Sequence, residues 1–170
     1  TADASAADEP AGDNRDLAAL AVVGAVGDRQ SGVSGLTGAN EGIVEEGVAA
    51  GVVEAGTDIT LYGKQTRPLP KLLEYATEAR IPGISNDTAG AIDFLSNLDL
   101  QLETDDGWRC WVDLTDEERQ TLLSALIHRA VASGVPADRI DDLVGTSYQL
   151  AYEEPGTVLR DASEFSTLLN

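Results

Sequence analysis

Apolar residues along the chain recur mostly at the three- and four-residue spacing of amphipathic helices. The clearest stripe predicts a helix over residues 116–133, and Thr115, three residues before Glu118, has the spacing of a capping box. This stripe consists of Leu122, Leu123, Leu126, Ile127 and Ala130. The same spacing, with cap residues, predicts further helices over residues 15–26, 39–50, 68–77, 87–98 and 136–143 and from residue 161 onwards.

Shorter segments have the alternating pattern of strands. Ile59 and Leu61 alternate with polar neighbours, which predicts two short strands joined by a turn at residues 55–57. Residues 107–114, GWRCWVDL, also alternate and predict a half-buried strand, and residues 147–156 predict a strand that leads into a turn. We therefore expect a mostly helical α+β fold with a few short strands.

The charge is strongly acidic, with 30 aspartates and glutamates against 11 lysines and arginines and a net charge of -19. Lysine occurs only as Lys64 and Lys71, and small residues are favoured, which is typical of a protein from a salt-saturated cytoplasm. An ordinary acidic protein is the alternative. Because molar salt screens phosphate contacts for every protein, the charge does not exclude a nucleic-acid partner. Residues 1–14 are acidic and small, and they predict a flexible linker.

The sequence lacks the residues that several common kinds of functional site require. Cys110 is the only cysteine, which excludes an internal disulfide and a cysteine-rich zinc site, and His128 is the only histidine. Residues 24–28, GAVGD, lack the third glycine of a dinucleotide fingerprint, and residues 62–66, YGKQT, lack the earlier glycine and the hydroxyl of a phosphate-binding loop. With no long apolar stretch and no signal peptide, the sequence predicts a cytoplasmic protein.

One carboxylate stands out by its position. The apolar run of residues 21–27 ends at Asp28, which is followed by Arg29. A carboxylate on a rigid scaffold suits a hard divalent cation, whereas an aspartate at a helix end on the solvent boundary is the alternative, although the helix dipole disfavours it. We take Asp28 as a candidate metal ligand, and Arg29 and Arg67 as candidate substrate-binding residues. Helix capping or surface pairing is the alternative role for Arg67.

Five segments follow one another along the chain: LAALAVVGAVGDRQ, LTGANEGIVEEGVAAGVVE, LYGKQTRPLPKLLEYAT, IPGISNDTAGAIDFL and WVDLTDEERQ. Together they resemble the middle of archaeal RecJ-like proteins, which are single-strand-specific exonucleases of the DHH phosphoesterase family. The resemblance runs from about Arg15 to the C-terminus. It implies a doubly wound α/β catalytic lobe that binds Mn²⁺ or Mg²⁺, an inserted helical region and a C-terminal DHH-associated domain. Asp28 matches the aspartate that closes the family's fourth motif, so the resemblance implies a metal-ligand role for it.

The resemblance also implies a domain organisation. Residues 1–14 would be the linker, residues 15–80 the C-terminal edge of the DHH-type α/β catalytic lobe, residues 81–155 the inserted helical module with a few short strands, and residues 156–170 the lead into the next domain. The earlier metal-binding motifs of the family have no counterpart in the sequence.

We therefore expect the chain to be an internal fragment of a metal-dependent exonuclease of a halophilic archaeon. Such a hydrolase would act on single-stranded DNA in DNA repair and DNA replication. One aspartate cannot hold two metal ions, so the 170-residue chain itself is expected to be inactive. The alternative is a protein-interaction module, because the inserted region of archaeal relatives is associated with the replication complex GINS. A structural domain without a partner is a third possibility.

Overall fold

The computed structural model describes residues 15–28, 31–32, 35–77 and 79–169. The predicted linker, residues 1–14, lies outside these ranges. The helices are α1 (Arg15–Gly27), α2 (Ala39–Ala49), α3 (Leu69–Glu74), α4 (Thr88–Ser96), α5 (Asp116–Ala132), α6 (Ala137–Asp141) and α7 (Ala162–Leu169), with a 3-10 turn, η1 (Trp111–Asp113). The strands are β1 (Ser31–Gly32), β2 (Gly35–Leu36), β3 (Val53–Ile59), β4 (Glu103–Thr104), β5 (Gly107–Trp108) and β6 (Val144–Leu150). The predicted class, a mostly helical α+β fold, is confirmed.

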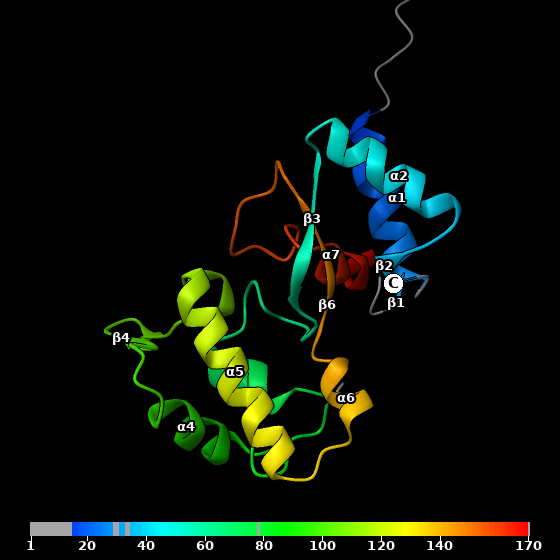
Figure 1. Cartoon of the computed structure of the whole chain (residues 1–170). Coiled ribbons are helices and arrows are strands. Elements are labelled where there is room, and N and C mark those ends of the chain that lie inside the picture. The colour runs from blue at the N-terminus through cyan, green and yellow to red at the C-terminus, as the bar shows by residue number, and fades with distance from the viewer. Residues whose placement is uncertain (1–14, 29–30, 33–34, 78, 170) are drawn as a thin grey trace, which may run out of the picture.

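A two-stranded ribbon formed by β3 and β6 runs through the middle of the molecule (Figure 1). The strands are antiparallel, and they pair without interruption from Val53 opposite Leu150 to Ile59 opposite Val144. The predicted turn at residues 55–57 is therefore wrong. These residues stay extended because each has a pairing partner on β6, about ninety positions further along the chain.

One hydrophobic core, here called the central core, lies at one end of the ribbon and is built by residues 59–143. Below the ribbon in Figure 1, the long helix α5 crosses the middle of this region, with α4 and α6 beside it. Apolar residues at helical spacing form the core because each helix turns one stripe inward. Its largest members include Ile59, Leu61, Leu69, Leu72, Leu73, Ile81, Ile84, Leu95, Trp111, Leu122, Leu126 and Leu143.

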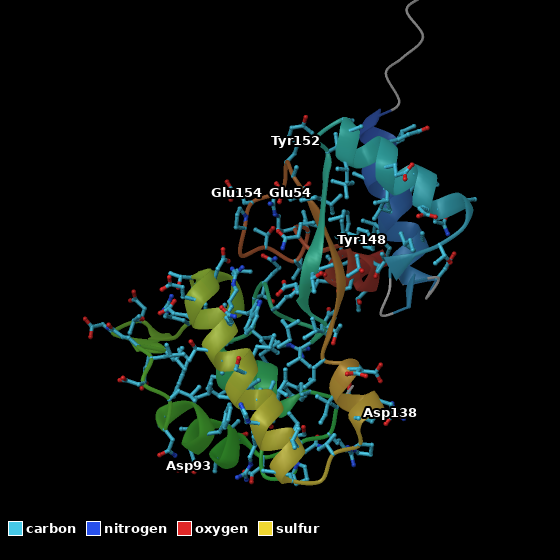
Figure 2. The ribbon with its side chains drawn as sticks, viewed as in Figure 1. Glu54, Asp93, Asp138, Tyr148, Tyr152 and Glu154 are labelled. Carbon is cyan, nitrogen blue, oxygen red and sulfur yellow. The ribbon has the colours of Figure 1, made fainter. Side chains whose placement is uncertain are left out.

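A second core, here called the terminal core, lies at the other end of the ribbon. There α1, α2 and α7 pack together against the first part of β3 and the last part of β6 (Figure 1). Tyr148 on β6 belongs to this core, and its hydroxyl accepts a hydrogen bond from the backbone N–H of Leu36 at 2.8 Å (Figure 2). The first and last described segments of the chain therefore share one core, while the residues between them form the other.

The predicted strand over residues 107–114 is wrong for most of its length. Gly107 and Trp108 pair as β5 in a hairpin with β4, Cys110 forms an isolated antiparallel bridge with Pro68, and the chain then turns through η1. The alternation places Trp108 and Trp111 on opposite faces, and in the structure Trp111 is the buried tryptophan, at 2% exposed. Its indole N–H donates to Oδ1 of Asp58 at 2.9 Å, a contact with β3 that overrides the local pattern.

Local signals at helix ends agree with the structure. The hydroxyl of Thr115 accepts from the N–H of Glu118, and the Glu118 carboxylate accepts from the N–H of Thr115, as the capping box requires. Arg109 also donates to both carboxylate oxygens of Glu118, at 2.9 Å each, and these bonds lower the pKa of Glu118 to about 2. Asp87 caps α4 through the N–H of Gly90; the sequence leaves the cap open between Asn86 and Asp87. The helix predicted over residues 68–77 is shorter in the structure, where α3 spans Leu69–Glu74.

Candidate functional site

The loop that joins β3 to α3, residues 60–68, makes polar contacts within itself and with β6 and α7. Its sequence is TLYGKQTRP. Gly63 has a φ of 98°, and its carbonyl accepts from the N–H groups of Thr66 and Arg67 at 3.2 and 2.8 Å. A Cβ at Gly63 would overlap the side chain of Arg67. Glycine is therefore required at this position both for the left-handed backbone and for the close packing of the arginine.

Arg67, the predicted substrate-binding residue, lies between two aromatic rings. Its guanidinium carbon is 4.9 Å from the ring centroids of both Tyr62 and Tyr75, and Nη1 donates to the Tyr62 carbonyl at 3.4 Å. Lys71 lies 5.6 Å from the Tyr75 centroid and pairs with Glu74 at 2.6 Å. Within the described ranges, no carboxylate forms an ion pair with Arg67. The arginine is thus held in place by aromatic contacts, and its charge is left without a bonded counter-charge.

Lys64 has the opposite environment. Its side chain is 5% exposed, and its ammonium lies 3.2 Å from Oδ2 of Asp58 and 3.1 Å from Oδ2 of Asp161. It also donates to Oγ of Ser147 at 2.8 Å and to the Ile59 carbonyl at 3.2 Å. We call Lys64, Asp58, Ser147 and Asp161 the Lys64 cluster. Because an ammonium has three hydrogens and here has four acceptors, no donor remains for a ligand.

The Lys64 cluster connects the two cores. Asp58, at the end of β3, accepts from the indole of Trp111 in the central core. Asp161, which is 2% exposed, accepts through Oδ1 from the N–H groups of Ser163 and Glu164 at the start of α7. The cluster therefore fixes α7 against the ribbon, and we assign it a structural role.

Glu164 is a second buried acid beside the loop. The sequence predicts that Glu164 completes a capping box with Asp161, and half of this is confirmed, since its N–H does bond to Asp161. Its carboxylate instead accepts from the N–H of Gln65 at 2.9 Å, through Oε1. Within the described part of the chain the other oxygen, Oε2, has no hydrogen-bond partner, and burial raises the pKa of this carboxyl. The side-chain amide oxygen of Gln65 in turn accepts from the N–H of Gly156 at 3.0 Å.

Two large cavities in the described part of the structure adjoin the ribbon. One, of about 440 Å³, is lined by Lys64, Ser147 and Asp161 together with residues from α1, α6 and α7. The other, of about 470 Å³, lies between the ribbon and α5 and includes Asp58 and Trp111 in its wall. The charged groups of the Lys64 cluster that face these spaces already have partners within the protein.

In the part of the chain that the structure describes, Asp28 forms no hydrogen bond or ion pair with this loop. It follows the last residue of α1, its backbone N–H donates to the Gly24 carbonyl, and its side chain is exposed. Among the described residues, no group of three or more histidines, cysteines, aspartates or glutamates could hold a metal ion. The described residues therefore do not by themselves form a site for a divalent cation. Asp28 would need further ligands from outside the described residues to hold one. The metal role of Asp28 stays a prediction, and Arg29 lies outside the described residues.

Residues 61–144 match the family model described as the DHH-CID domain. The match supports a protein of the DHH phosphoesterase family. The matched segment has nearly the same limits as the central core, which begins at Ile59 and ends at Leu143. The match is therefore to a region that packs around its own hydrophobic interior. No curated protein matches the chain.

The predicted domain division stays a prediction. The packing adds one fact to it: Leu69, Leu72 and Leu73 share the central core with Leu95 and Leu122. Helix α3, which lies before residue 80, and the helices α4 and α5 after it are thus parts of one packed unit. None of the helices in the described ranges has the length and apolar character needed to cross a membrane.

Proposed function

We propose that the chain is a fragment, which includes the DHH-CID domain, of a RecJ-like, metal-dependent exonuclease that degrades single-stranded DNA in the cytoplasm of a halophilic archaeon. The observation that carries the proposal is the DHH-CID match over residues 61–144. The ordered resemblance of the flanking segments and the strongly acidic composition support the finer assignment. DNA repair and DNA replication are the processes in which such an activity would serve.

Within this proposal the described residues have limited parts. A bound Mn²⁺ or Mg²⁺ would supply Lewis-acid activation of water and of the scissile phosphate. Asp28 would contribute one carboxylate to such a site, and the arginines at positions 29 and 67 would contact the nucleic-acid backbone. The 170-residue chain alone is proposed to be inactive, because hydrolysis by two metals needs several ligands at fixed separation.

The test measures nucleotide release from an end-labelled single strand by the complete gene product, with Mn²⁺ and with EDTA. We expect metal-dependent release, slower release from the matching duplex, and loss of activity in Asp28→Ala. Asp93→Ala is the matched control, because Asp93 is an exposed aspartate on α4 (Figure 2). Equal activity of Asp28→Ala and the parent would remove Asp28 from the metal site. No release under any metal condition would refute the exonuclease.

A second proposal is that the DHH-CID region docks to a replication complex such as GINS. The observation that favours it is the closed packing of residues 59–143 around their own core. In the same region, Val131 is 61% exposed and Ile92 is 37% exposed, on α5 and α4 respectively. Co-elution of the chain with purified GINS, weakened by Val131→Asp, would support docking. Independent elution of the two would contradict it.

A further inference from the structure

The guanidinium of Arg67 is oriented before any ligand arrives. Tyr62 and Tyr75 contact it at equal distances, and the tight turn at Gly63 packs against its aliphatic part. An arginine side chain normally loses rotamer entropy when it binds, and here the protein has already restricted it. Among the described residues its only hydrogen bond is the long one from Nη1 to the Tyr62 carbonyl. The remaining N–H donors are therefore available to an external acceptor.

The surroundings of Arg67 favour a negatively charged ligand with a flat group attached. We define the Arg67 patch as Tyr62, Arg67, Lys71 and Tyr75. Tyr75 is 51% exposed, and the Lys71 side chain is 48% exposed beside the same ring. In a chain of net charge -19 this patch brings two cations together with two aromatic rings, beside the carboxylate of Glu74, which pairs with Lys71, and near the buried carboxyl of Glu164, which interacts electrostatically with Arg67. An anionic group of a ligand can therefore bind the oriented guanidinium of Arg67, and a planar group of the same ligand can stack on the exposed ring of Tyr75.

We propose that the Arg67 patch binds one nucleotide unit of a single-stranded nucleic acid, with a backbone phosphate on the Arg67 edge and a neighbouring base stacked on Tyr75. This inference rests on the proposed function for its class of ligand. A single strand supplies both an acceptor matched to a guanidinium and an unstacked base matched to a ring. A duplex keeps its bases stacked, so the tyrosine would have no partner.

The small number of cations makes a specific prediction about salt. A single strand bound through one phosphate loses affinity with a slope of about −0.7 in log K against log salt. Base stacking on an aromatic ring is far less dependent on salt. The site is therefore suited to a high-salt solution, in which a broad basic surface would lose its advantage.

The test titrates the purified chain into a fluorescein-labelled oligothymidylate and follows fluorescence anisotropy, with EDTA present so that no hydrolysis occurs. Tyr75→Ala is expected to weaken binding by about 5- to 150-fold, which corresponds to the 1–3 kcal/mol of one stacked base. Arg67→Gln is expected to weaken binding and bring the salt slope close to zero. Arg67→Lys keeps the charge without the planar edge, so it should lie between Arg67→Gln and the parent.

The matched control is Arg139→Gln, which makes the same charge change on α6, where Arg139 pairs with Asp142. It should bind as the parent does. Equal weakening by Arg139→Gln, or unchanged binding by Arg67→Gln and Tyr75→Ala, would overturn the inference. Displacement of the oligonucleotide by inorganic phosphate at equal concentration would also overturn it, since that result identifies an anion site without a strand. If Arg67→Gln fails to fold, Arg67→Lys and Tyr75→Ala decide the matter by the same criteria.

The two proposals fail in different ways. The anisotropy assay requires neither metal nor turnover, so Arg67-dependent binding can hold while the complete gene product releases no nucleotides; that result would refute the exonuclease alone. Metal-dependent release together with Arg67-independent binding would refute the patch alone.

Discussion

Replacing Lys64 with methionine tests the assignment of the Lys64 cluster as the link between the two cores. The substitution removes the ammonium and leaves the carboxylates of Asp58 and Asp161 in place. Breaking a buried ion pair in this way costs about 3–5 kcal/mol, because a charge stays buried without its partner. Asp161 is the more affected acid, since its side chain is 3% exposed, against 17% for Asp58.

In the Lys64→Met variant each carboxylate keeps hydrogen bonds that partly offset the loss of the ammonium. Oδ1 of Asp58 still accepts from Trp111, and Oδ1 of Asp161 still accepts from two N–H groups at the start of α7. We therefore expect a loss near the lower end of the range, about 3 kcal/mol in the free energy of unfolding. For a domain of this size that corresponds to about 6–12 °C in Tm.

The assay is urea unfolding at fixed salt, followed by tryptophan fluorescence. Urea carries no charge and leaves ion pairs unscreened, and Trp111, bonded to Asp58, reports on the site itself. The double variant Lys64→Met/Asp161→Asn should be more stable than Lys64→Met, because asparagine keeps the capping oxygen and removes the stranded charge. Lys71→Met, at the only other lysine, is the control and should leave the midpoint nearly unchanged. A loss below about 1 kcal/mol in Lys64→Met, or no recovery in the double variant, would refute the reasoning.

Two further predictions concern helix ends and pH. Thr115→Ala removes the N-cap of α5 and should destabilise the protein by about 1 kcal/mol in the same urea assay, whereas Thr121→Ala, inside the same helix, should cost less; equal losses would contradict the capping box. Burial raises the pKa of Glu164 above its usual value of 4.5, so the carboxyl takes up a proton more readily in the folded state and stability falls as the pH rises through that raised pKa. Glu164→Gln should therefore have a higher Tm than the parent at pH 8 and the same Tm near pH 4, and a difference that is equal at both pH values would show that ionisation is not the cause.

Local sequence patterns predicted most of the helices. The stripe on α5, its capping box and the Asp87 cap of α4 involve residues three or four positions apart, so the pattern contains both partners of each contact. The same holds for the end of α2 before Gly51, which has the positive φ of 71° that glycine adopts freely. These elements could be read from the chain because their causes are local.

The candidate site was only partly predictable. Arg67 is a candidate from the sequence, but its contacts with two aromatic rings are not. Tyr62 lies near the start of the loop and Tyr75 follows the end of α3, so both contacts with Arg67 depend on how this segment folds. Lys64 is one of only two lysines in the sequence, which is a weak indication of a special role. Its partners Ser147 and Asp161 lie on β6 and just before α7, so the sequence does not reveal them. Glu164 has the spacing of a capping residue, but it contacts Gln65, 99 positions earlier.

By itself, the sequence determined the helices, their caps, the class of fold and the acidic surface, since each depends on neighbours in the chain or on composition alone. Tertiary structure decided that β3 is one continuous strand paired with β6, that Trp111 rather than Trp108 is buried, and that the acids at positions 161 and 164 meet the loop after β3. These contacts join residues that are tens of positions apart. Their free energy depends on burial and on partners that exist only after the two cores have formed, so no local pattern contains them.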